Sequence, residues 1–476
     1  MNKTFNKFIY KFSYKNKIKI IYKFNCVYKF RLILVLFIAF IYISYILQYS
    51  NDKVFENNYI INNNMIKIGY YCNSIKNGGV ERVMAQLIKY LSIEKTFIHY
   101  LICVEGILEG EYPIPNSTIR INLKFRRLSL FNAIKRNNID ILIYNFYDRS
   151  EIKKLNKLDK TKVIFYNHST YFYWIYLHVY NFKYSVYSDY KKCNYIISLI
   201  PVENDYLFKK WGINSILMDN PSTIEYNSVT PSELKQKNII MVGRAKDHIK
   251  RYDLGIKAMQ TIIKEITICE MNIVSVPLDK YERLIRELNL SNYVRFVGYQ
   301  KDVEIYFKNS SLHIMPSLAE SYSMALGEAK IFGVPSIICG LDYLLLAKGG
   351  TIIIYDDNPD TIAKEAIKIL KDDKYRLKLG KEARQSMKKH NNTLIMKKWI
   401  ELLMAVYKGD IDTYRNISDK TYKIKDEERE HILNNQYQLF VRREQNFRNL
   451  KFQNFIDYYK MYYIFFRVIL DFYREK

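Results

Sequence analysis

Glu320-Ser-Tyr-Ser-Met-Ala-Leu-Gly-Glu328-Ala-Lys-Ile-Phe-Gly-Val-Pro335 is the stretch of this chain that predicts its fold most directly. The apolar run Leu312–Met315 before it is typical of a short buried strand, and Ser336–Cys339 after it is typical of another. Between them, Ser323 can cap a helix that the closing Gly-Val-Pro sequence would end. The stretch therefore predicts a strand–loop–helix–strand unit, with one carboxylate in the loop and a second inside the helix.

Strand and helix patterns alternate along most of the chain, which has 476 residues and is long enough for two or three domains. Such alternation predicts an α/β fold with two doubly wound, Rossmann-like domains that face each other across a cleft. We place these domains at 65–222 and 223–385, because Asn220-Pro221 and a polar stretch interrupt the pattern. A helix at 386–410 and a basic, aromatic helical extension at 411–476 follow. The expected strands are Met65–Tyr71, His99–Val104, Ile139–Tyr144, Val163–Asn167, Tyr195–Leu199, Asn238–Gly243, Met271–Val276, Val294–Gly298, Leu312–Met315, Ser336–Cys339 and Thr351–Ile354.

The N-terminal region has a different composition from the rest. Residues 1–31 hold eight Lys, one Arg and no acid, and 32–49 form a nearly unbroken apolar run. As a helix this run would span about 27 Å, close to the hydrocarbon thickness of a bilayer. No small-residue cleavage site follows it, so we expect an uncleaved transmembrane anchor with a cytoplasmic basic leader, and a linker at 50–64. A buried core helix is the alternative interpretation.

Charge and cysteine spacing argue against several other classes of protein. The formal net charge of +26 is concentrated in the leader and diffuse elsewhere, with no recognisable nucleic-acid-binding module, so we expect no nucleic-acid partner. The six cysteines show no CxxC spacing, which predicts buried thiols and neither a zinc site nor a disulfide framework. The aromatic end, 454–476, suits either a membrane interface or packing on the protein's own surface.

Three further motifs lie where strands are expected to end. Gly243-Arg244 follows one strand, and Lys250 follows in the same loop; two cations there can clamp a diphosphate. The Gly78-Gly79 pair precedes a helix and lets a ligand approach the backbone closely. His168 ends a strand of the first domain, which predicts a side chain that faces the cleft. A solvated basic loop, an ordinary glycine turn and a structural histidine are the respective alternatives.

Taken together, these motifs resemble a retaining glycosyltransferase of family 4, within the glycosyl transferases group 1. The resemblance runs from about Met65 to about residue 405 and implies the GT-B fold, with an N-terminal acceptor domain and a C-terminal nucleotide-sugar donor domain. The Glu-x7-Glu segment with its Gly-Val-Pro ending is the specific part. The supporting elements are Gly78-Gly79-Val-Glu-Arg82, His168, Asn220-Pro221, Gly243-Arg244, Lys250, Val297-Gly298 and Pro316-Ser317.

The resemblance implies roles for four charged residues. Arg244 and Lys250 match the pair that neutralises the donor diphosphate, and they would stabilise the charge that develops as the nucleotide leaves. Glu328 matches the acid that holds the ribose hydroxyls. Glu320 matches the acid near the transferred sugar. We therefore expect Glu320, Arg244 and Lys250 to be catalytic and Glu328 to bind the donor.

Four more residues receive roles in the same way. His168 matches a first-domain histidine near the sugar ring and is expected to be catalytic. The backbone amides of Ser323 and Met324 match those that face the sugar and phosphate, and Gly79 matches the glycine loop near the phosphates. The resemblance implies front-face attack without a protein nucleophile, no catalytic metal and no cofactor besides the nucleotide-diphospho-sugar donor.

The sequence departs from the family pattern next to these residues. The usual Glu-Gly-Phe-Gly becomes Glu320-Ser-Tyr-Ser323, and Arg251 stands where a glycine is frequent. Such changes bear on the choice of sugar more than on the class of reaction.

The function expected from the sequence is transfer of a hexose-type sugar to a glycan or lipid-linked acceptor at a membrane. The alternatives are a non-catalytic GT-B-like or basic binding protein, and a GT-B epimerase or phosphorylase. The basic leader predicts a translocated body, whereas sugar nucleotides are made mostly in the cytosol. We favour a single-pass membrane protein whose catalytic domain works at the cytosolic surface.

Overall fold

The computed structural model describes residues 65–76, 78–125, 127–146, 148–170, 191–244, 248–412, 414 and 424–449. The expected leader (1–31), anchor (32–49) and linker (50–64) lie outside these residues, and so does the aromatic end (454–476). None of the helices in the described ranges is both long enough and apolar enough to cross a membrane.

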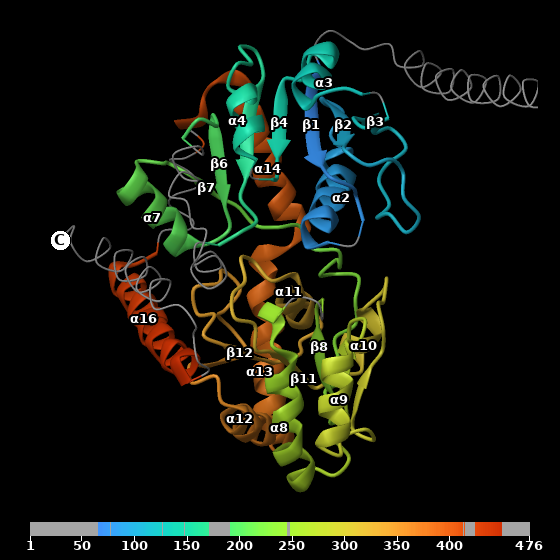
Figure 1. The fold of residues 1–476 in the computed structure, drawn as a ribbon, viewed down its shortest axis with the longest axis vertical. Coiled ribbons are helices and arrows are strands. Elements are labelled where there is room, and N and C mark those ends of the chain that lie inside the picture. The colour runs from blue at the N-terminus through green and yellow to red at the C-terminus, as the bar shows by residue number, and fades with distance from the viewer. Residues whose placement is uncertain are drawn as a thin grey trace, which may run out of the picture. The chain divides into compact units, whose positions relative to one another are not determined.

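A seven-stranded parallel sheet forms the first domain, in the order β3-β2-β1-β4-β5-β6-β7 (Figure 1). Strand β1 pairs with β2 along one edge and with β4 along the other. Helices cover both faces of such a sheet, so its central strands are continuous apolar runs, and every residue of β4 is buried. The strands are β1 Ile66–Cys72, β2 Phe97–Cys103, β3 Ile119–Asn122, β4 Ile141–Tyr144, β5 Lys162–Tyr166, β6 Tyr195–Ser198 and β7 Ile216–Leu217.

The helices of the first domain begin and end at residues that suit those positions. Ser129 and Asp148 cap α3 and α4 with side-chain oxygens that accept backbone N–H groups. Helix α7 begins with Pro201, and Gly212, with a left-handed φ of 59°, caps its C-terminus. The helices are α2 Gly79–Leu91, α3 Leu130–Asn137, α4 Arg149–Leu155 and α7 Pro201–Trp211.

A six-stranded parallel sheet forms the second domain, in the order β10-β9-β8-β11-β12-β13. Its strands are β8 Ile239–Val242, β9 Met271–Val274, β10 Val294–Phe296, β11 Leu312–Met315, β12 Ser336–Cys339 and β13 Thr351–Ile354. Its helices are η1 His248–Lys250 (3-10), α8 Tyr252–Glu265, α9 Asp279–Glu287, α10 Glu304–Lys308, α11 Met324–Ile331, α12 Pro359–Lys371, α13 Asp373–Ser386 and η2 Met387–His390 (3-10).

Two Rossmann-like α/β domains are therefore present, and the predicted fold class is confirmed at that level. The expected strands agree with the observed ones to within two residues at each end. Strands β3 and β7 were not expected. Strand β3 includes Arg120 and Asn122 at the sheet edge, where a polar side chain is tolerated, and β7 has two residues. Both lack the apolar run that would have indicated a strand.

Two helices follow the second sheet. Helix α14, Asn392–Lys408, returns to the first domain and packs against α2 and β4 (Figure 1). Its Trp399 is fully buried, with its ring centroid 5.2 Å from that of Tyr166. Helix α16, Asp426–Asn449, lies within the expected extension and buries Ile432, Leu433 and Leu439 against the rest of the protein.

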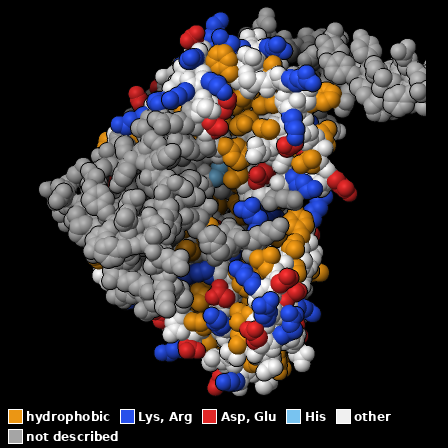
Figure 2. Space-filling model, in the orientation of Figure 1, with side chains coloured by type: hydrophobic (Ala, Val, Ile, Leu, Met, Phe, Trp, Pro, Cys, Tyr) orange, Lys and Arg blue, Asp and Glu red, His pale blue; other side chains and the backbone are white. Residues whose placement is uncertain are grey.

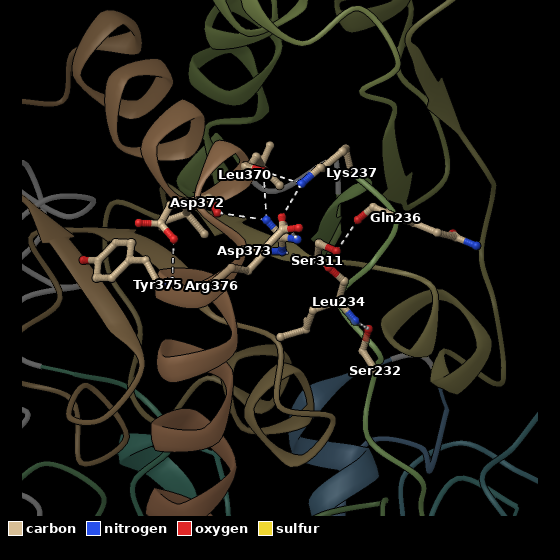
Figure 3. A network of polar contacts seen from close by, with 11 residues as sticks. Ser232, Leu234, Gln236, Lys237, Ser311, Leu370, Asp372, Asp373, Tyr375 and Arg376 are labelled. Atoms are coloured by element: carbon tan, nitrogen blue, oxygen red, sulfur yellow. Dashed lines mark hydrogen bonds and ion pairs between the residues drawn. The ribbon is translucent and has the colours of Figure 1, made fainter.

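The segment that leads into the second sheet is held by buried polar contacts (Figure 3). Arg376 of α13 is 2% exposed and donates to the carbonyl oxygens of Leu234 and Leu370, both at 2.8 Å. Lys237 donates to the Leu370 carbonyl at 2.6 Å and pairs with Asp373 at 2.8 Å. These bonds fix where β8 begins, and hence where its carboxyl end lies.

The described surface mixes both charges. On the face shown in Figure 2, basic and acidic side chains are interspersed over the part of the chain that is coloured by type. The described cysteines are free thiols: Cys72, Cys103, Cys269 and Cys339 are buried, and Cys193 is partly buried. Burial raises the pKa of Cys339 to about 12, so this thiol is inert at neutral pH.

Candidate active site

The loop after β11 and the start of α11 form one wall of the site. Ser323 caps α11 as predicted, because its Oγ accepts the Leu326 N–H at 3.4 Å. Its φ of 63° lies in the left-handed region, where glycine is the residue with least strain. The first N–H groups of a helix have no intrahelical acceptor, so the Met324 end of α11 suits a phosphate.

Lys250 and Glu320 meet beside this wall. Lys250 Nζ lies 2.5 Å from Glu320 Oε1, and the two side chains are 22% and 12% exposed. They are 70 residues apart in sequence but follow β8 and β11, which are adjacent strands of one parallel sheet. A Cβ at Gly243 would lie 3.2 Å from Lys250 Cε, so this glycine leaves room for the lysine chain.

Glu328 is the most buried of the expected site residues, at 1% exposed. Its Oε1 accepts the Thr223 hydroxyl at 2.9 Å and lies 3.0 Å from Arg82 Nη1. Arg82 belongs to the first turn of α2, in the other domain. The carboxylate that was expected to hold the ribose is therefore also part of an ion pair that joins the two domains.

The start of α2 faces the basic loop of the second domain. Burial raises the pKa of the Glu81 carboxyl, and a hydrogen bond to its own backbone N–H and the positive charge of Arg244 act against that rise. Arg244, which is exposed, therefore lies close enough to α2 for its charge to act on Glu81. Gly79 is the exposed first residue of the helix, and an added Cβ would have no atom within 4 Å.

His168 follows β5 in the first domain. Its Nε2 lies 2.9 Å from Asn145 Oδ1, and the Asn145 amide donates to the Tyr71 carbonyl at 3.0 Å. Burial lowers the pKa of His168 to about 3, so the ring is neutral at pH 7. Since the Asn145 oxygen accepts, His168 carries its proton on Nε2, and Nδ1 is the acceptor nitrogen.

The segment that leads from the first domain to the second includes Asp219 and Asn220. Buried polar contacts connect this segment to the Glu320 loop. Asp219 is fully buried, with Oδ1 2.6 Å from His390 Nδ1 and accepting the Tyr322 hydroxyl at 3.3 Å. The next residue, Asn220, accepts the Tyr166 hydroxyl at 2.5 Å. Asp219 thus links the segment between the two domains to the Glu320 loop through Tyr322.

The structure brings some of the sequence-predicted residues together and leaves His168 apart from them. Lys250 and Glu320 are in direct contact, and Arg244 acts on the start of α2, which begins at Gly79. His168 contacts Asn145 and Tyr166, which both belong to the first domain. The individual roles given to these residues stay predictions.

Sequence reasoning missed Arg82 and Thr223 as partners of Glu328. Arg82 stood inside a motif that had been noted for its glycines, three positions after Gly79 and therefore on the same face of the helix. That spacing was the available signal. Thr223 carried none, because a lone threonine in a polar stretch is common in loops.

Two doubly wound domains, with helix N-termini, cations and buried carboxylates between them, define a GT-B type of protein. Residues 223–386 match the family model of the glycosyl transferases group 1. The recognition made from the sequence is thereby confirmed at the level of group 1. Membership of family 4 and a retaining stereochemistry stay predictions.

The chain is also similar to proteins of known sequence or structure. An uncharacterized glycosyltransferase of Haemophilus influenzae is 23% identical over 218 residues, which is 44% of this chain and 61% of that protein. Sucrose-phosphate synthase from Thermosynechococcus elongatus has a TM-score of 0.60 at 15% identity, covering 72% of this chain and all of that one.

Two further structures share the fold. Anabaena HepE, in complex with UDP and glucose, has a TM-score of 0.56 at 12% identity over 71% of this chain and all of its own. WaaG, a glycosyltransferase involved in lipopolysaccharide biosynthesis, has a TM-score of 0.54 at 13% identity over 69% and 98%. At these identities the similarity shows the GT-B fold alone.

Proposed function

We propose that this protein is a retaining glycosyltransferase that moves a hexose-type sugar from a nucleotide-diphospho-sugar to a glycan or lipid-linked acceptor at a membrane. The observation that carries the proposal is a set of two ion pairs, Lys250–Glu320 within the second domain and Arg82–Glu328 between the domains. The group 1 family match and the UDP and glucose named for HepE support the donor class.

The donor diphosphate would lie between Lys250, Arg244 and the N-terminus of α11. Lys250 Nζ pairs with Glu320 Oε1 at 2.5 Å. An incoming diphosphate competes for Lys250 and frees Glu320 to accept a hydroxyl of the transferred sugar. Glu328 would accept the ribose hydroxyls through Oε2, because its Oε1 already accepts from Thr223 and Arg82.

Transfer would follow a front-face path. The bond between the anomeric carbon and the phosphate oxygen breaks while the acceptor hydroxyl bonds to the same face of that carbon. The hydroxyl proton passes to the departing phosphate oxygen, whose growing charge Lys250 and Arg244 stabilise. Neutral His168 would accept a hydrogen bond from a sugar hydroxyl at Nδ1, because its Nε2 already bonds to Asn145.

A panel of UDP-, GDP- and ADP-sugars tests the proposal, with release of the nucleoside diphosphate and of free sugar as the readout. One donor should be hydrolysed by the wild-type protein, and EDTA should not change its rate. We expect Lys250→Ala and Glu328→Gln each to lower that rate at least about 100-fold, because each removes charge that faces the donor.

Matched controls separate this effect from general loss of charge. Lys257→Ala changes an exposed lysine on α8, and Glu382→Ala changes an exposed glutamate on α13. Both should keep near wild-type turnover. Turnover in Lys250→Ala and Glu328→Gln equal to that of the controls would refute the site. Nucleotide binding without release of sugar from any donor would favour a non-catalytic GT-B protein.

A further inference from the structure

Helix α16 reaches the donor loops through one buried arginine. Arg443 is 4% exposed, and its guanidinium grips Asp357 with two bonds: Nε to Oδ2 at 2.6 Å and Nη2 to Oδ1 at 3.1 Å. Its Nη1 donates to the Leu318 carbonyl at 3.3 Å. Leu318 lies two residues before Glu320, so α16 contacts the segment that carries a proposed catalytic acid.

Asp357 is shared between Arg443 and a second arginine. Arg251 places Nη1 2.7 Å from Asp357 Oδ2 and Nη2 2.8 Å from Oδ1. Burial alone would raise the pKa of Asp357, but hydrogen bonds and charges from both arginines hold it at about 2. The carboxylate is therefore ionised throughout the physiological range and serves as a fixed link between the two guanidinium groups.

Arg251 in turn holds both loops of the proposed donor site. It directly follows Lys250, and its Nε donates to the Pro316 carbonyl at 2.6 Å. The Leu318 N–H donates to the Ile249 carbonyl at 2.7 Å, and these two side chains pack together with Ala319. Lys250 is therefore next to Arg251, and Glu320 is two residues from Leu318. Both Arg251 and Leu318 belong to the contacts that connect to Arg443.

The backbone at these contacts is in a strained conformation. Arg251 has a φ of 46° and Asp357 a φ of 52°, both in the left-handed region. Such residues cost on the order of 1 to 3 kcal/mol each and persist where their surroundings over-determine them. Here the contacts that hold the strained backbone are the ion pairs of Asp357 with Arg251 and with Arg443, and Arg443 belongs to α16.

The rest of α16 is attached to both domains. Near its start, Arg429 lies 3.0 Å from Asp205 of α7 in the first domain. Farther along, Gln436 donates to the Gly340 carbonyl at 2.7 Å in the second domain. Gly340 has a φ of 61°, and a Cβ there would overlap Leu439 of α16, so the loop is shaped for close approach of this helix.

We infer that α16 is a positioning strap for the donor site, and that Arg443 acts through Asp357 and Arg251 to hold Lys250 and Glu320 where a donor diphosphate binds. This inference rests on the proposed function. Arg443 lies outside residues 223–386, which match the family model. The extension therefore contributes to the position of site residues that lie within the matched segment.

The test compares binding of nucleoside diphosphates and monophosphates to the full-length protein. UDP, GDP and ADP are titrated beside UMP, GMP and AMP, and the ratio of the two affinities is taken for the base that the wild type prefers. In Arg443→Ala this ratio should fall about tenfold, with monophosphate affinity unchanged, because the strap orders the groups that face the second phosphate.

Three further variants sharpen the test. Arg443→Lys should recover part of the lost ratio, and Asp357→Asn should lose it as Arg443→Ala does. Both keep the buried volume, so they carry the test if Arg443→Ala does not fold. The matched control is Arg442→Ala, which removes an exposed arginine of α16 that donates to the Tyr355 carbonyl at 3.3 Å. It should bind like the wild type.

The outcomes distinguish the strap from the proposed function. A wild-type protein that binds none of the six nucleotides overturns the proposed function and the inference with it. A wild type that prefers diphosphates, with Arg443→Ala indistinguishable from Arg442→Ala, overturns the strap alone. Equal weakening of monophosphate and diphosphate binding also overturns it, since that pattern shows a loss of folded protein and not of loop position.

Discussion

At the scale of the residue, Lys330 of α11 is an unusual case of a fully buried amine. It lies two residues after Glu328 and is 0% exposed. Its Nζ donates to the carbonyl oxygens of Leu346 at 2.5 Å and Lys348 at 2.6 Å. Burial and, secondarily, the charge of Lys389 lower the pKa of Lys330 to about 7. A neutral amine still has two N–H groups, so both bonds survive deprotonation.

We predict that Lys330 makes the stability of the protein depend on alkaline pH. The folded pKa is lower than the unfolded one, so the unfolded state binds more protons between about pH 7 and pH 10. The free energy of unfolding of the wild type, relative to Lys330→Met, should therefore rise across this range by about 1.4 kcal/mol per pH unit at most. Urea unfolding at pH 7, 8 and 9 measures it. A difference that is flat or falls with pH would contradict the assignment.

At the scale of the element, α11 begins from a position that the backbone would leave to glycine. Ser323 takes a φ of 63°, and Arg251, the residue before α8, takes a φ of 46°. These are two of the positions at which the sequence departs from the glycines usual in the family. Each residue offsets the strain with its side chain: Ser323 caps its helix, and Arg251 binds Asp357.

The two contributions of Ser323 can be separated by substitution. Ser323→Ala loses the cap and keeps the strain, so the free energy of unfolding should fall by about 1 kcal/mol. Ser323→Gly loses the cap but relieves the strain, so the fall should stay under about 0.5 kcal/mol. Denaturant midpoints of the purified variants measure both.

Ser129 provides the matched position for this comparison. It caps α3 in the same way but at a φ of −75°, where alanine is unstrained. The alanine and glycine variants should therefore differ less at Ser129 than at Ser323. An equal difference at both positions would show that the left-handed backbone of Ser323 contributes nothing to stability.

At the scale of the whole molecule, polar contacts join the two domains, and one of them involves a proposed donor-site residue. Arg82 of the first domain pairs with Glu328 of the second at 3.0 Å. On α14, Asn392 donates to the Tyr90 hydroxyl at 2.9 Å and to Glu225 at 3.0 Å, which connects α2, the segment between the two domains and α14. If the donor binds at Glu328 as proposed, its binding should be coupled to the packing of the two domains.

We predict that Arg82→Ala weakens both nucleotide binding and closure of the domains. The change leaves the Glu328 carboxylate buried with the Thr223 hydroxyl and removes a cross-domain ion pair. Diphosphate affinity should fall about tenfold, and the radius of gyration of the nucleotide-free protein, measured by small-angle X-ray scattering, should increase. Lys89→Ala, an exposed lysine at the other end of α2, should change neither. Arg82→Ala with wild-type scattering and affinity would refute this coupling.

The sequence by itself determined the local elements and the residue types of the site. Apolar runs and turn residues placed most strands within two residues, because period and capping are local properties. The same local signals placed Glu320, Arg244 and Lys250 in loops that follow strands, and Glu328 inside the helix after the Glu320 loop. The sequence did not predict short edge strands such as β7, because two residues are too few to form a recognisable pattern.

The tertiary structure alone decided which of these residues meet. Lys250 reaches Glu320 because β8 and β11 are neighbours in the sheet, an order that periodicity does not encode. Glu328 reaches Arg82 because two domains pack together, and Arg443 reaches Asp357 because α16 docks on the second domain. These contacts join residues 70 or more positions apart, where local sequence carries no distance information. The site is therefore a property of the packed fold.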